Sequence, residues 1–201
     1  MFALVESGSI TKMLNGRRGI TIDGVQHPQQ IFTIWTESER NAIGIYTVEM
    51  DNSKRKDKQW YINTDITYTF SGGKVTGSYG DATAKAHADT LYTAQDETDG
   101  LGTEGDVKAE GLKTILIRQV KNEAKGELNR TDWYVVRKAE EDVAIPSAIT
   151  THRKSVRSKQ AEMETAITNA SDTPALETLY TYTKQEDETT TRPLGEIPNL
   201  D

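Results

Sequence analysis

The first eighty residues alternate between apolar and polar positions in the way that strands of a half-buried sheet do. The clearest pair lies at residues 65–70 and 74–79, where apolar side chains occupy every second position on both sides of a Ser-Gly-Gly turn. Other runs of β-branched and aromatic residues lie at 19–22, 31–35 and 43–50. Consecutive strands joined by hairpins favour an antiparallel sheet. We therefore predict an antiparallel β-rich domain over residues 1–80.

From residue 106 the apolar positions recur at steps of three and four, which is the period of a helix that packs along one face. The first stripe contains Leu112, Ile115, Leu116, Val120, Ala124 and Leu128. We expect a second long helix from Pro146 to about residue 170, because a first helical turn tolerates proline. Asp172 followed by Pro174 repeats this signal with a capping side chain and predicts a short third helix. Residues 106–183 are thus predicted to form a helical hairpin with a short third helix, and the fold class is α+β.

Two segments lack either period. Residues 81–105 are rich in Ala, Thr, Asp and Gly and are predicted to be a polar linker between the two domains. Residues 184–201 are acidic and Thr-rich, and Pro193 and Pro198 interrupt them. We predict an extended acidic tail there, which gains order only where it lies along a surface.

Charge and composition narrow the class of partner. The formal net charge of −7 argues against a nucleic-acid partner, because binding phosphates requires clustered Lys and Arg. The only basic cluster, residues 54–58, is expected to be a solvated loop. No segment approaches the run of about eighteen apolar residues that a membrane span needs, and the opening MFALVES lacks the pattern of a signal peptide. We therefore expect no membrane partner, and assembly in a cytoplasm.

Candidate chemistry is sparse. Gly100 to Gly105 spell GxGxxG ahead of a helix, but no apolar strand precedes them and the neighbouring acids would repel a pyrophosphate, so the linker interpretation is favoured. The same acids match a calcium loop only weakly. None of His27, His87 and His152 has a second His one helical turn away, so the sequence has no helical zinc pair, and each histidine is expected at the surface. With no cysteine either, we predict no catalytic, cofactor-binding or metal-binding residue and no cofactor, and thus a protein that is not an enzyme.

Two features of the helical half have alternative interpretations. Arg153 and Arg157 lie one turn apart, either on a solvent face with ion pairs to Glu162 and Glu164 or on a face that meets an acidic partner. That partner would be the chain's own acidic tail or the tail of another copy. Trp133 either marks an interface or fills the space between the two long helices, and we predict the second location.

The helical half also resembles a module of tailed-bacteriophage tail and tail-fibre-assembly proteins. In that module a helix is followed by a Thr/Ser-Asp-Trp turn, a connection to Pro, and a helix bearing a His/Tyr-Arg stretch with a second Arg. Here RTDWYVVRKAEED (130–142) and AIPSAITTHRKSVR (144–157) place Asp132-Trp133, Arg153 and Arg157 at the matching positions. The segment ITIDGVQHPQQIFTIWTESERNAIGIY (20–46) is similar to the front of such proteins, and the ending TRPLGEIPNLD resembles the tails of virion proteins of marine T4-like phages.

This resemblance implies a non-enzymatic structural or adaptor protein of a phage tail, baseplate or fibre. Such a protein would be a virion component that contacts other virion or tail proteins and forms a homo-oligomer. The alternative is a tail-fibre assembly chaperone that is absent from the mature virion. A metal-dependent hydrolase is a third possibility, although no motif points to it.

Overall fold

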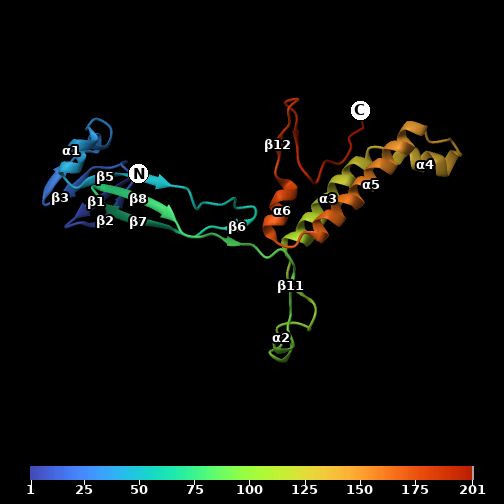
Figure 1. Cartoon of the computed structure of the whole chain (residues 1–201), viewed down its shortest axis with the longest axis horizontal. Coiled ribbons are helices and arrows are strands. Elements are labelled where there is room, and N and C mark those ends of the chain that lie inside the picture. The colour runs from blue at the N-terminus through green and yellow to red at the C-terminus, as the bar shows by residue number, and fades with distance from the viewer. Residues whose placement is uncertain (201) are drawn as a thin grey trace. The chain divides into compact units, whose positions relative to one another are not determined.

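The computed structural model describes residues 1–200, and the chain divides into two compact units (Figure 1). The first unit covers residues 1–83 and the second begins at Ala84. Strands are the main regular structure of the first unit, whereas the long helices all belong to the second. The predicted α+β class is therefore confirmed.

A five-stranded sheet with the order β2-β1-β5-β8-β7 is the framework of the first unit. Its strands are β1 (Phe2–Glu6), β2 (Ser9–Leu14), β5 (Ile45–Asp51), β7 (Ile66–Ser71) and β8 (Lys74–Tyr79). The hairpin predicted at 65–79 is present as β7 and β8. However, β5 and β8 run parallel, so the prediction of a wholly antiparallel sheet is wrong at this pair. The physical reason is burial, since β8 carries the fully buried Val75 and gains cover from β5, while β7 has no fully buried residue and forms the edge.

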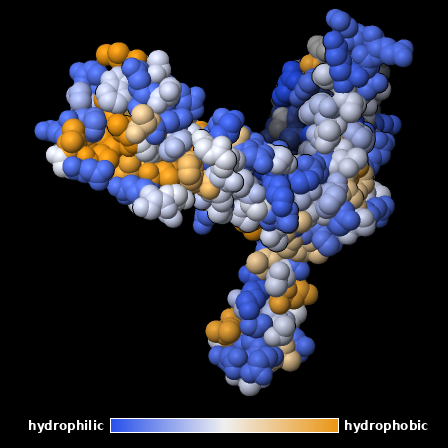
Figure 2. All heavy atoms as spheres, turned by 60° about the vertical axis from the view of Figure 1, so that its left-hand side comes forward, coloured by the Kyte–Doolittle hydropathy of each residue, from blue (hydrophilic) through white to orange (hydrophobic). Residues whose placement is uncertain are grey.

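Each face of this sheet has its own apolar cluster. On one face, Leu4 and Ile45 pack with residues of β3 (Ile20–Ile22) and of the 3-10 helix η1 (Gln29–Phe32). The opposite face holds Ala3, Val5, Val48 and Val75, surrounded by partly exposed side chains: Ile10, Met13, Tyr46, Tyr68 and Phe70. Alternation along each strand explains the division, because successive side chains point to opposite faces. Figure 2 shows hydrophobic side chains gathered at the surface of this unit.

The remaining elements of the first unit are short. They are β4 (Val25–His27), α1 (Glu37–Ala42) and β6 (Tyr61–Ile62). Helix α1 begins at a capping box, in which the Thr36 hydroxyl accepts from the Glu39 N–H and the Glu39 carboxylate accepts from the Thr36 N–H. Strand β9 (Thr83–Ala84) lies at the boundary of the two units.

Two long helices, α3 (Leu112–Asn129) and α5 (Ser147–Asn169), pack against each other in the second unit (Figure 1). Their buried apolar residues are Leu112, Leu116, Val120 and Ala124 of α3 and Ile149, Val156, Met163 and Ile167 of α5. Helix α4 (Asp132–Glu141) lies in the connection between them, and α6 (Thr173–Tyr180) follows α5. Asp172 caps α6 by accepting from the Ala175 N–H, and Pro174 sits in its first turn, as the sequence predicted.

The segment predicted as a polar linker, 81–105, is partly folded. Strands β10 (Thr90–Leu91) and β11 (Val107–Ala109) pair, and α2 (Ala94–Thr98) lies between them. Because residues 107–109 form a strand, α3 begins at Leu112 rather than near residue 106. Local polar contacts hold this small lobe together, since Asp96 accepts from Thr93 and pairs with Lys108 Nζ at 2.6 Å. A search for apolar periodicity does not detect such structure.

The C-terminal residues are ordered along the surface of their own unit. Strands β12 (Thr183–Lys184) and β13 (Thr190–Thr191) form a hairpin, and residues 192–200, here called the docked tail, return to the helices. The predicted extended acidic tail thus contains a hairpin before its extended part. None of the described helices is long and apolar enough to span a membrane.

Candidate functional site

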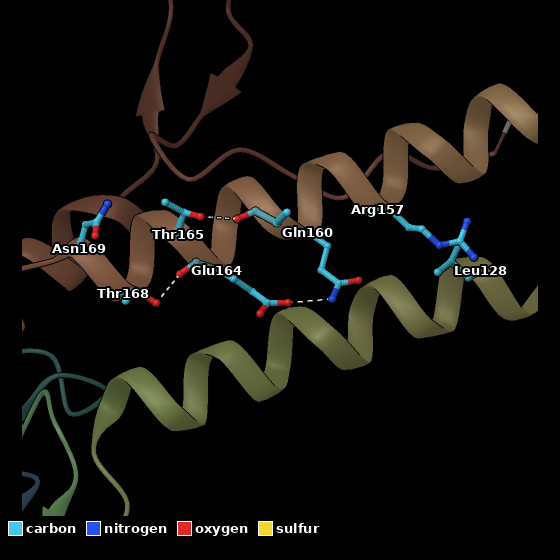
Figure 3. A pocket seen from close by; sticks show the side chains of 8 residues that line it. Leu128, Arg157, Gln160, Glu164, Thr165, Thr168 and Asn169 are labelled. Carbon is cyan, nitrogen blue, oxygen red and sulfur yellow. Dashed lines mark hydrogen bonds between the residues drawn. The ribbon is translucent and has the colours of Figure 1, made fainter.

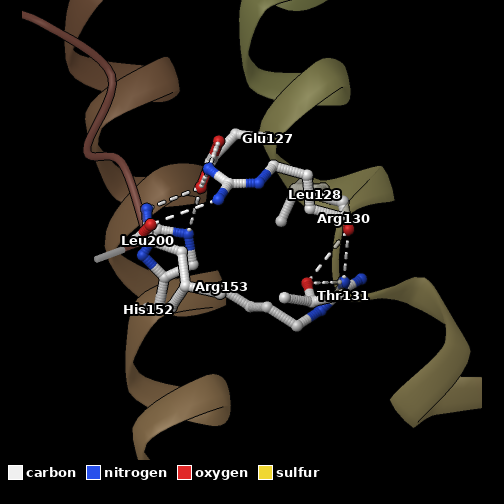
Figure 4. A network of polar contacts seen from close by, with 7 residues as sticks. All are labelled: Glu127, Leu128, Arg130, Thr131, His152, Arg153 and Leu200. Atoms are coloured by element: carbon white, nitrogen blue, oxygen red, sulfur yellow. Dashed lines mark hydrogen bonds and ion pairs between the residues drawn. The ribbon is translucent and has the colours of Figure 1, made fainter.

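Buried polar side chains from three segments meet where α3 passes into α4 (Figure 4). Glu127 of α3 is only 7% exposed. Its carboxylate accepts hydrogen bonds from Arg130 Nη1 at 2.9 and 3.0 Å and from the Leu200 N–H at 2.7 Å. His152 Nε2 of α5 lies 3.0 Å from the same carboxylate. Glu127 therefore links α3, α5 and the docked tail.

The charge of Glu127 is stabilised by these neighbours. Burial raises the pKa of its carboxyl, but the Arg130 hydrogen bond, the Leu200 N–H and the positive charge of Arg130 together hold the pKa below its ordinary value. The carboxylate is therefore ionised at neutral pH, and a buried charge of this kind is tolerated because it is paired and hydrogen-bonded.

A second buried group, Arg153, fixes the junction between α3 and α4. Its Nη1 donates to the Leu128 carbonyl at 2.8 Å and to Thr131 Oγ1 at 2.6 Å, and its Nη2 pairs with Asp132 Oδ1 at 2.9 Å. The last carbonyls of a helix have no partner within the helix, and Arg153 supplies a charged donor to the Leu128 carbonyl beside the N–H and hydroxyl of Thr131. The same guanidinium holds the first residue of α4, and it thereby sets where α4 starts.

The sequence-based predictions for His152 and Arg153 were wrong. His152 is largely buried rather than at the surface, and Arg153 is 8% exposed rather than on a solvent face. The spacing that would have located Arg153 is present, because Ile149, Arg153 and Val156 follow the i, i+4, i+7 pattern of one helical face. A stripe defined by apolar residues alone skips the arginine in its middle.

The predicted ion pairs of Arg153 and Arg157 with Glu162 and Glu164 are not formed, because both glutamates pair with lysines. Arg157 is exposed and lines a groove along α5 with Leu128, Gln160, Ala161, Glu164, Thr165, Thr168 and Asn169 (Figure 3). Glu162 pairs with Lys159 at 3.4 Å, and Glu164 pairs with Lys121 of α3 at 3.5 Å. Gln160 Nε2 donates to Glu164 Oε1 at 2.7 Å. The groove is thus lined by polar groups that already bind one another, which favours a structural role for them.

The sequence-based prediction that Trp133 fills the space between the long helices is wrong, because the residue is 51% exposed. No residue of α4 is buried. The Trp133 ring lies 3.9 Å from the Tyr134 ring, and the Arg137 guanidinium lies 4.7 Å from the Trp133 centroid. The exposed apolar residues of α4 and the turn after it, here called the α4 face, are Trp133, Val135, Val136 and Val143.

The docked tail is held at both of its ends. At one end Leu194 is 2% exposed, and its N–H donates to the Leu179 carbonyl at 3.0 Å. Arg192 lies over the rings of Tyr180 and Tyr182, with guanidinium-to-centroid distances of 5.0 and 5.4 Å. At the other end Arg130 Nη2 donates to the Leu200 carbonyl at 3.2 Å, in addition to the Glu127 contact. Arg130 therefore bonds the tail, and Lys159 of α5 lies against Gly195, whereas Arg153 bonds residues 128, 131 and 132 instead.

The other candidate groups lie apart from this junction in the chain. Gly100 and Gly105 have positive φ angles and belong to the small lobe after α2, so they do not join a strand to a helix as a nucleotide-binding fingerprint does. His27 packs edge-on against Trp35 with ring centroids 5.9 Å apart. Lys54 of the basic cluster pairs with Asp81 at 2.9 Å. Within residues 1–200, no three His, Cys, Asp or Glu side chains are grouped to hold a metal ion.

Comparisons of the chain with known protein families, with curated proteins and with solved structures found no match. The functional assignment therefore rests on the residues and their geometry.

Proposed function

We propose that this chain is a non-enzymatic structural or adaptor protein of a phage tail, baseplate or fibre, and that it acts through contacts with other virion proteins and with copies of itself. The observation that carries the proposal is the α4 face. A helix with no buried residue exposes a tryptophan and two valines, and Val143 is exposed just after it. Trp133 and Val136 are three residues apart and so lie on the same side of α4, and an exposed aromatic side chain beside an exposed aliphatic one is typical of a protein-protein interaction site.

The attachment of α4 supports the same function. Arg153 and Asp132 form an ion pair at 2.9 Å, and Thr131, the residue before α4, is fully buried. The helix is thus anchored at its start while its apolar side chains remain exposed. An interface built on an anchored helix loses less conformational entropy on binding than one built on a loop.

The two motifs that carry the resemblance to phage tail modules contact each other in the folded chain. They are the Thr-Asp-Trp turn and the His-Arg stretch, and Asp132 of the first bonds Arg153 of the second. The arginine and aspartate position the turn, and the turn presents Trp133 outward. We infer that the module is a device for presenting an aromatic side chain to a partner.

Mass spectrometry of purified particles of the phage that encodes the chain tests the location. We expect the chain in the particles at a copy number that matches a symmetric tail substructure. Presence in infected cells bound to fibre protein, with absence from the particles, would replace this proposal by the assembly-chaperone alternative.

Affinity purification tests the contact itself. Tagged wild-type chain should retain its virion partner, and Trp133→Ala should lose most of it, since exposed tryptophans at interfaces are frequent hot spots. The matched control is Lys138→Ala, which removes an exposed charge of the same helix. Equal retention by wild type and Trp133→Ala would show that the α4 face is not the interface.

A further inference from the structure

The docked tail shows that the second unit contains a groove that binds an extended peptide. Leu194 inserts an apolar side chain, and Arg192 stacks on two tyrosines. The backbone is bound as well, because the Leu194 N–H and both polar groups of Leu200 have partners on the helices. Side-chain pockets combined with main-chain hydrogen bonds are the usual basis of peptide recognition.

The segment that joins α6 to the docked tail has few contacts of its own. Every residue from Thr181 to Thr191 is exposed. Most of its hydrogen bonds lie within the β12–β13 hairpin, such as the one from the Gln185 N–H to the Thr189 carbonyl at 2.8 Å. Tyr182 ties the base of this segment to the tail, because its Oη donates to Glu196 Oε1 at 2.5 Å and Arg192 lies over its ring. An isolated two-stranded hairpin is marginally stable in water, so little free energy opposes its opening.

Once opened, this segment is long enough to reach another molecule. Eleven residues in extended conformation span roughly 36 Å, at about 3.3 Å per residue. The contacts that the tail makes within its own copy can all be made identically in the groove of a neighbour. Exchange of an identical element between copies is a low-cost route to association, because only the hairpin and the entropy of association are lost.

We propose that the groove formed by α6, the C-terminal end of α3 and His152 of α5 binds residues 192–200 of a second copy, so that copies associate by exchanging their tails. The proposed function includes contacts between copies of the chain, and the tail exchange rests on that part of it. The exchange specifies the residues through which the copies associate. It does not depend on whether the chain belongs to a virion, so the failure of one leaves the other testable.

The first experiment measures the groove. A fluorescent peptide with the sequence of residues 192–201 is titrated into full-length wild type and into full-length Leu194→Asp. The substitution places a charge where Leu194 is buried, so it releases the tail and leaves the groove free. We expect saturable anisotropy with the variant and at least about tenfold weaker binding with wild type, whose groove its own tail occupies.

Two matched controls make the result specific. A peptide carrying Leu194→Asp should bind about tenfold more weakly or not at all. Combining Leu194→Asp with Glu127→Gln in the protein should weaken binding of the wild-type peptide, because the neutral amide replaces the charged acceptor of the Leu200 N–H. Combining it instead with Glu141→Gln, at the exposed end of α4, should leave binding unchanged. If Leu194→Asp fails to fold, a chain ending at Thr191 takes its place as acceptor.

The second experiment tests exchange between copies. Leu194→Asp supplies a free groove with a defective tail, and Glu127→Lys supplies an intact tail with a defective groove. Sedimentation of each variant alone should show monomer, and their mixture should form a heterodimer of twice the mass. Absence of peptide binding by a folded Leu194→Asp variant would contradict the proposal that the groove binds an added tail peptide. Peptide binding without a heterodimer in the mixture would overturn the exchange.

Discussion

Helices α4 and α5 are neighbours in the chain, and both are amphipathic, yet they differ in what they bury. Helix α5 buries Ile149, Val156, Met163 and Ile167 against the rest of its unit, whereas no residue of α4 is buried and only Tyr134 and Arg137 are half-buried. The polarity of the side chains does not predict this difference, because the charged Arg153 of α5 is only 8% exposed while the aromatic Trp133 of α4 is 51% exposed. An apolar stripe on a helix therefore indicates a surface whose burial is favourable, and the packing of neighbouring elements determines whether that burial occurs within the chain itself.

The largest effect is expected at the centre of α5. Met163→Ala should lower the free energy of unfolding by about 2–5 kcal/mol, because it leaves a cavity in a packed stripe. Urea denaturation followed by circular dichroism measures this change. The control is Thr165→Ala, an exposed residue of the same helix, for which we expect a change within about 0.5 kcal/mol. Similar losses for both would mean that α5 has no buried stripe.

A smaller loss is expected at the polar junction. Arg153→Ala should cost about 1–3 kcal/mol, because the Leu128 carbonyl and Thr131 Oγ1 lose a charged donor in a buried position. The same variant should also loosen α4, so hydrogen exchange of residues 132–141 should increase more than that of α3. Arg157→Ala is the matched control one turn away, and it should change neither quantity. If α4 exchanges at the wild-type rate in Arg153→Ala, the guanidinium does not anchor it.

The third effect depends on pH. The pKa of the Glu127 carboxyl is lowered in the folded chain. The ionised carboxylate therefore stabilises the folded state at pH values above the ordinary carboxyl pKa, and this stabilisation is lost as pH falls through the lowered pKa. Glu127→Gln should therefore cost about 1 kcal/mol at neutral pH, and the difference should shrink on acidification below about pH 4.5. Thermal unfolding of both proteins across this range checks the sign. A difference that grows toward acidic pH would show that the carboxylate is destabilising.

The smallest effect is expected on the α4 face. Trp133→Ala should change stability by less than about 0.5 kcal/mol, since the side chain is half exposed and its ring contacts Tyr134 and Arg137 of its own helix. A loss of about 3 kcal/mol or more, the range for emptying a large buried site, would show that Trp133 belongs to a core after all. Denaturation of the purified variant, compared with its partner binding, separates stability from function.

Periodicity determined much of this protein. The steps of three and four residues located α3 and α5, the alternation at 65–79 located the β7–β8 hairpin, and Asp172 with Pro174 marked the start of α6. These signals are local, because a helix or a hairpin is formed by residues that are close in the chain. The resemblance to phage modules likewise came from short motifs, and the function it implies remains a proposal.

Tertiary structure decided the rest. The parallel pairing of β5 with β8, the burial of Arg153 and the exposure of Trp133 depend on which elements pack together, and residues far apart in the sequence determine that. Glu127 and Leu200 are separated by 73 positions, and only the folded chain brings them within 2.7 Å. Local sequence patterns indicate which side chains favour burial or pairing with an opposite charge. Long-range packing chooses the partner, since its free energy depends on contacts that no short segment contains.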